Sequence, residues 1–83
     1  MIMAFTDTER QVIVDGRRAL LPVAHHWVSR DEYSDELMFT AAYTWIHQES
    51  DLEDETKAEE CAHQITDWLS ALVPPEKRHE YSS

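Results

Sequence analysis

One pair of residues in this chain, Glu60 and His63, has the spacing of a metal site. Glu-x-x-His is the spacing with which one helix supplies two metal ligands in di-metal carboxylate bundles. Such a site needs a second copy of the motif and further carboxylates that face inward, and the sequence has a single copy. On the helix expected here, the two side chains lie opposite Ile65 and Leu69 and face water. We therefore expect no metal site at this pair.

Histidine and cysteine are also present in patterns that chemistry could use. His25 and His26 are adjacent, so on a helix they point about 100° apart and cannot bind one metal together. Cys61 falls on the expected apolar side of its helix, where a lone cysteine is most often a small buried side chain. The single glycine cannot form a glycine-rich phosphate loop, and no nucleophile elbow is present. We expect no enzyme activity and no cofactor.

The strongest chemical signal is a concentration of carboxylates in the middle third of the chain. The formal net charge is −10, and residues 31–60 hold eleven acids against Lys57 alone. Acids in a first helical turn stabilise a helix by about 0.3–1 kcal/mol each at most, and acids also aid solubility. Dense charge can equally steer association with a basic surface. The predicted partner-binding residues are Asp31, Glu32, Asp35, Glu36, Glu49, Asp51, Glu53, Asp54, Glu55, Glu59 and Glu60.

Charge and hydropathy exclude several classes of partner. Direct binding to nucleic acid needs clustered lysine and arginine, which this acidic chain lacks. The same charge disfavours an anionic membrane surface, and no stretch has the roughly 18 uninterrupted apolar residues of a membrane span. A lone cysteine excludes an internal disulfide and fits a reducing compartment. We expect a cytoplasmic protein.

Helical periodicity predicts the elements that carry these residues. We predict a compact all-α bundle of three to four short helices at about 7–20, 22–29, 34–49 and 54–72. Residues 1–73 form the predicted domain, and residues 74–83 form a polar tail. Thr6 and Glu9 have the spacing of a capping box, and Pro22 should end or kink the first helix. Asp15-Gly16 leaves an alternative, a hairpin over residues 11–19, although the unbroken helical phase favours a helix.

The helix expected over residues 34–48 is apolar around roughly 220–240° of its circumference. A face this wide predicts that the helix is the central element of the bundle. The expected middle of the face contains Leu37, Met38, Ala41 and Trp45. One tryptophan falls on each helical segment, which predicts a shared aromatic core made by Trp27, Trp45 and Trp68.

These features predict a binding protein and not an enzyme. The favoured hypothesis is a small acidic inhibitor or decoy, a DNA mimic whose carboxylates replace phosphates on a basic surface of a partner protein. In size and charge the chain is similar to phage-encoded viral anti-defence proteins, anti-CRISPR proteins among them, although it shares no motif with them. The alternatives are an antitoxin-like regulator and a homodimeric structural or accessory protein. The residues that such a dimer would use are Phe39 and Tyr43 on the central helix, with Ile2, Met3 and Phe5.

Overall fold

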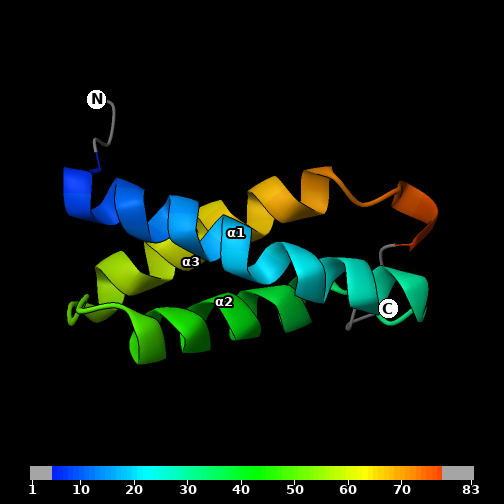
Figure 1. Cartoon of the computed structure of the whole chain (residues 1–83), viewed down its shortest axis with the longest axis horizontal. Coiled ribbons are helices and arrows are strands. Elements are labelled where there is room, and N and C mark those ends of the chain that lie inside the picture. The colour runs from blue at the N-terminus through cyan, green and yellow to red at the C-terminus, as the bar shows by residue number, and fades with distance from the viewer. Residues whose placement is uncertain (1–4, 78–83) are drawn as a thin grey trace.

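The computed structural model describes residues 5–77 and contains three helices and one short final turn. The helices are α1 (Asp7–Ser29), α2 (Asp35–Glu49) and α3 (Glu55–Ala71), and the 3-10 turn η1 covers Pro75–Lys77. The helices lie side by side along the long axis of the molecule (Figure 1). No strand occurs between residues 5 and 77. The predicted all-α bundle is confirmed. Ile2, Met3 and the tail beyond residue 77 lie outside the described residues.

The first helix begins with the predicted capping box. The Thr6 hydroxyl accepts a hydrogen bond from the Glu9 N–H at 3.2 Å, and the Glu9 carboxylate accepts one from the Thr6 N–H at 2.8 Å. Val12, Ile13 and Gly16 are buried along one face of the helix. Residues 11–19 are therefore helical, and the alternative hairpin is wrong.

Pro22 lies inside α1, so the predicted division into helices at 7–20 and 22–29 is wrong. A proline in a helix interior removes one hydrogen bond and typically costs about 3 kcal/mol. Here the pyrrolidine ring is exposed, whereas Leu20 and Ala24, one on each side of it, are buried on the same face. Packing of that continuous face against the rest of the bundle outweighs the missing hydrogen bond.

The central helix of the bundle is α3, which packs against both other helices. The prediction that residues 34–48 form the central helix is therefore wrong. α3 contacts α1 and α2 more extensively than these two contact each other. Three small residues, Ala58, Cys61 and Ala62, are fully buried on it, and small side chains let neighbouring helices approach closely. On α2 the fully buried residues are Met38, Ala42 and Ile46. The buried face is thus rotated from the predicted one, and Leu37, Ala41 and Trp45 are half-buried at its edge.

The tryptophans lie at the margins of the core, so the predicted shared aromatic core is also wrong. Trp27 and Trp45 are half-buried, and Trp68 is 39% exposed. The neighbouring Leu69 takes the buried position on α3 instead. The guanidinium of Arg17 covers part of the Trp68 ring, 5.2 Å from its centroid.

A buried chain of hydrogen bonds fixes the segment between α1 and α2. Tyr33 is fully buried, and its hydroxyl lies 2.7 Å from Ser70 Oγ. Ser70 in turn donates to Asp35 Oδ1 at 2.5 Å. Because Ser70 has one hydroxyl hydrogen and gives it to Asp35, Tyr33 is the donor to Ser70. The chain ties the start of α2 to the end of α3.

Candidate functional site

The structure separates the predicted acidic residues into two groups at opposite ends of α2 (Figure 1). The first group, Asp31, Glu32, Asp35 and Glu36, lies before and at its start. The second group begins at Glu49, its last residue. A helix of 15 residues is about 22 Å long at 1.5 Å per residue. The two groups therefore do not form one patch.

Most of the first group has a structural role. Asp31 adopts a left-handed φ of 61° just beyond α1. Its N–H donates to the Val28 carbonyl at 3.0 Å, and the Glu32 N–H donates to the Trp27 carbonyl at 2.8 Å, which is a Schellman motif that ends the helix. The Glu32 side chain accepts from Arg30 at 3.3 Å, and Asp35 accepts from Ser70. The Asp31 carboxylate lies 4.0 Å from Lys77 Nζ, so each of these three acids has a side-chain partner within the fold.

The second group forms the acidic end of the bundle. It comprises Glu49, Asp51, Glu53, Asp54, Glu55, Glu59 and Glu60. Asp54 is the N-cap of α3 and accepts from the N–H groups of Thr56 at 2.9 Å and Lys57 at 3.2 Å. The other six carboxylates make no hydrogen bond or ion pair with residues 5–77. All six are exposed except Glu60, which is half-buried.

The one lysine in the acidic end neutralises an acid of another helix. Lys57 Nζ lies 3.1 Å from Oε2 of Glu9, whose side chain is 5% exposed. The hydrogen bond from the Thr6 backbone N–H lowers the pKa of Glu9, and Lys57 lowers it further. Glu9 in turn raises the pKa of Lys57. Asp54 and Glu60 also contribute to the raised pKa of Lys57. The other acids of this group, Glu49, Asp51, Glu53, Glu55 and Glu59, form no ion pair within residues 5–77.

Helix stabilisation accounts for only part of the acidic end. Negative charge is favourable at the N-terminus of α3, where Asp54 and Glu55 lie, and unfavourable at the C-terminus of α2, where Glu49 lies. Asp51 and Glu53 are in the connector and cap neither helix. Repulsion among Glu49, Asp51 and Glu53 opposes folding, which favours a role for these carboxylates in binding.

A shallow groove of about 410 Å³ adjoins the acidic end between α1 and the end of α2. Asp15, Glu49 and Asp51 line it together with the half-buried ring of Trp45. Carboxylates beside an aromatic ring favour a lysine or arginine side chain, which gains ion pairs and a cation–π contact. The acidic end therefore presents a concave surface to a partner as well as negative charge.

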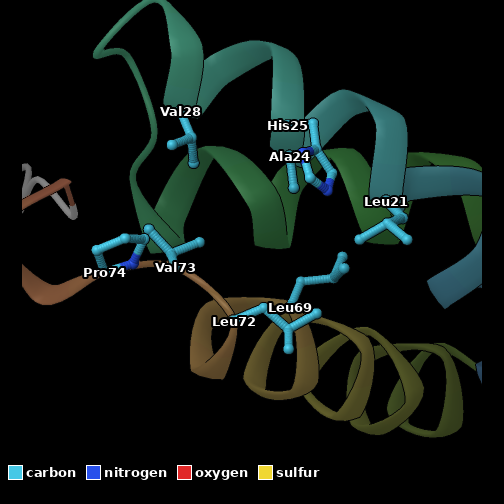
Figure 2. A pocket seen from close by; sticks show the side chains of 8 residues that line it. All are labelled: Leu21, Ala24, His25, Val28, Leu69, Leu72, Val73 and Pro74. Atoms are coloured by element: carbon cyan, nitrogen blue, oxygen red, sulfur yellow. The ribbon is translucent and has the colours of Figure 1, made fainter.

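A second surface, which sequence reasoning missed, is a groove between α1 and α3. Figure 2 shows its deepest part, a cavity of about 160 Å³ with side chains of the two helices and of the following segment on opposite walls. The lining residues are Leu21, Ala24, His25, Val28, Leu69, Leu72, Val73 and Pro74. A hollow of about 300 Å³ continues it past the shared Leu21, lined also by Val14, Arg17, Arg18 and Trp68. We call the two together the α1–α3 groove. The sequence does contain one signal for this groove, because Val14 and Leu21 are apolar residues outside the buried face of α1.

No family model, curated protein or solved structure matched this chain in comparisons with known proteins. The acidic end and the α1–α3 groove therefore carry the functional interpretation by themselves.

Phe39 and Tyr43, the predicted dimer residues, are half-buried and pack against neighbours within the chain. The Phe39 ring centroid lies 4.5 Å from that of His63 and 6.1 Å from that of Tyr43. Tyr43 makes an edge contact with His47 at 4.5 Å. Among residues 5–77 the larger exposed apolar side chains lie elsewhere, on the α1–α3 groove.

The structure buries the cysteine and exposes the histidines that the sequence singled out. Cys61 is fully buried, as predicted, and burial raises the pKa of its thiol to about 11. His25, His26 and His63 are exposed. Within the described part of the chain, no group of three or more histidine, cysteine, aspartate and glutamate side chains could hold a metal ion. Likewise, no helix in residues 5–77 is both long and apolar enough to span a membrane.

Proposed function

We propose that this chain is a small protein-binding module whose acidic end docks on a basic surface of a partner protein. The observation that supports this function is the exposure of Glu49, Asp51 and Glu53, which have neither a capping role nor a counterion within residues 5–77. Clustered charge of this kind accelerates association with a surface of opposite sign. In this proposal the module is cytoplasmic, needs no cofactor and catalyses no reaction.

The partner surface that fits best is one that normally holds nucleic acid. Such surfaces present lysine and arginine at positions set by successive phosphates. Carboxylates on the end of α2, the connector and the start of α3 can occupy several of those positions at once. Trp45 and the adjoining groove then receive one cationic side chain of the partner. The module would inhibit by occupying the surface, as a decoy of the kind found among phage anti-defence and anti-CRISPR proteins.

Two matched triple variants test this proposal. Glu49→Gln/Asp51→Asn/Glu53→Gln removes three charges from the acidic end. Glu36→Gln/Asp67→Asn/Glu76→Gln removes three charges of the same residue types elsewhere. It includes Glu36 of the first group, which this proposal leaves outside the docking surface. None of the six side chains makes a hydrogen bond or ion pair with residues 5–77. Asp54 is left unchanged because it caps α3.

The partner is captured from a lysate of the natural host treated with RNase and DNase, and association rates are measured by surface plasmon resonance. At about 50 mM salt we expect the acidic-end variant to associate about tenfold more slowly and the control variant less than twofold. The difference should disappear near 500 mM salt, where the Debye length is about 4 Å. Nucleic acid should compete for the partner. Equal rates for the two variants would exclude docking through the acidic end.

A further inference from the structure

We propose that the α1–α3 groove binds an amphipathic helix of a partner protein that carries acidic residues beside its apolar face. This inference is independent of the acidic end, because the groove shares no lining residue with it. Three observations on the described residues support it: exposed apolar side chains, the shape of the groove and its charge.

The exposed apolar side chains of the described chain gather on this groove. The large hydrophobic residues that are exposed in residues 5–77 are Val14 at 41%, Trp68 at 39% and Leu72 at 57%. All three line the groove. Single exposed apolar residues are ordinary on a protein surface, whereas a contiguous set marks an interaction site.

The shape of the groove fits a helix. It follows α1 from Val14 to Val28, a length of about 21 Å at 1.5 Å per residue, or about four turns. A helix laid between α1 and α3 would complete a four-helix bundle. The cavity of about 160 Å³ in Figure 2 is about the size of an engineered cavity that holds benzene. It therefore accepts one large apolar side chain, the usual anchor of a helix bound in a groove.

The charge of the groove specifies an acidic partner. No carboxylate lines it, although the chain contains 17 acids. Its charged residues are Arg17 and Arg18, and neither forms an ion pair within residues 5–77. The contact with Trp68 holds the Arg17 guanidinium in place, so less side-chain entropy is lost when it binds a carboxylate.

A second copy of this chain is the poorer occupant. A two-fold symmetric contact places the same surface on both subunits. Each groove would then face the other, and neither contains a carboxylate that could pair with Arg17 and Arg18 of the other copy. Each copy would also bring a net charge of −10.

Two synthetic peptides provide the test with the full-length protein. They share leucines at positions i, i+3, i+4 and i+7 of a four-turn helix, and the flanking positions carry glutamate in one peptide and lysine in the other. Binding is measured by fluorescence anisotropy at about 100 mM salt. We expect the glutamate peptide to bind at least about tenfold more tightly. The net charge of the protein favours the opposite order, so this preference assigns binding to the groove.

Variants of the groove complete the test. Arg17→Gln/Arg18→Gln should abolish the preference for glutamate, whereas Arg10→Gln/Arg30→Gln, which removes two positive charges elsewhere, should retain it. Leu72→Ser and Val14→Ser should each weaken binding of the glutamate peptide, and thermal melts should show that these exposed positions tolerate the change. Two results would overturn the proposal: tighter binding of the lysine peptide that Leu72→Ser weakens, or no binding of the glutamate peptide. A dimer that Leu72→Ser splits would also overturn it, because a second copy would then fill the groove.

Discussion

Close packing of the three helices requires glycine at position 16. Gly16 lies in α1 against Ile65 of α3 and Trp45 of α2. A Cβ at this position would overlap Ile65 Cδ1 and lie 3.2 Å from Ile65 Cγ1 and 3.3 Å from Trp45 Cζ3. In an exposed helix, alanine is about 1 kcal/mol more stable than glycine. Here the overlap outweighs that preference.

We expect Gly16→Ala to lower the free energy of unfolding by about 1–3 kcal/mol, measured by urea denaturation. A double-mutant cycle isolates the cause, because Ile65→Val removes the Cδ1 atom that overlaps. In the Ile65→Val background the same Gly16→Ala change should cost less. Equal costs in the two backgrounds would contradict this packing explanation.

Cys61 should be an unreactive thiol. Burial raises its pKa from 9.0 to about 11, and the thiolate is the reactive form. At pH 8 we expect modification by a thiol reagent to be slow in the native protein and fast in denaturant. The pKa of the Cys61 thiol is higher in the folded protein than in the unfolded chain. The contribution of this buried thiol to the free energy of unfolding is therefore full below about pH 9 and is lost as the pH rises through about 11. Denaturation curves at pH 8 and 10.5 measure this loss, which Cys61→Ala should reduce. Rapid labelling of folded protein would contradict the burial.

At the scale of elements, local signals predicted the helices well. Helical phase and the capping box of Thr6 and Glu9 act within a few residues of the chain, so the sequence pattern was enough to identify them. Pro22 misled because its local penalty competes with burial of Leu20 and Ala24 against other helices. Neighbouring helices also decide which part of a wide apolar face is covered. For that reason the central role of α3 could not be predicted from periodicity.

Pro22 supplies a prediction for α1. It is exposed and interrupts the helical hydrogen bonds without ending the helix. We expect Pro22→Ala to restore one hydrogen bond and raise the free energy of unfolding by about 1–3 kcal/mol. Ala19→Gly, at an exposed position of the same helix, is the control and should lower it by about 1 kcal/mol. A loss of stability in Pro22→Ala would mean that packing requires a proline-dependent bend.

At the scale of the whole molecule, the sequence predicted the location of the charge but not which of the acids the fold itself uses. The acids of residues 49–60 were expected to act together with Asp31 and Asp35. The partner of Asp35 is Ser70, 35 positions away, so its structural role depends on the fold. The α1–α3 groove was missed for a related reason. Trp68 was expected in a shared aromatic core, and only the packed bundle shows that it is exposed together with Leu72.

The acidic end should make folding depend on salt. The chain has a net charge of −10, and like charges in a compact state repel one another. We expect the melting temperature to rise between about 10 and 500 mM NaCl, because the Debye length falls from about 30 Å to 4 Å over that range. The two triple variants each remove three negative charges, so a difference between them reports where the charges lie. Repulsion within residues 49–53 contributes to that difference, as does the helix dipole of α2, which favours Glu36 in the first turn and disfavours Glu49 at the end. Glu49→Gln/Asp51→Asn/Glu53→Gln should raise the melting temperature at low salt and flatten its salt dependence more than Glu36→Gln/Asp67→Asn/Glu76→Gln does. Identical salt dependence in the two variants would mean that only the total charge affects stability. The exposed carboxylates of residues 49–60 would then oppose folding no more than acids elsewhere on the surface do.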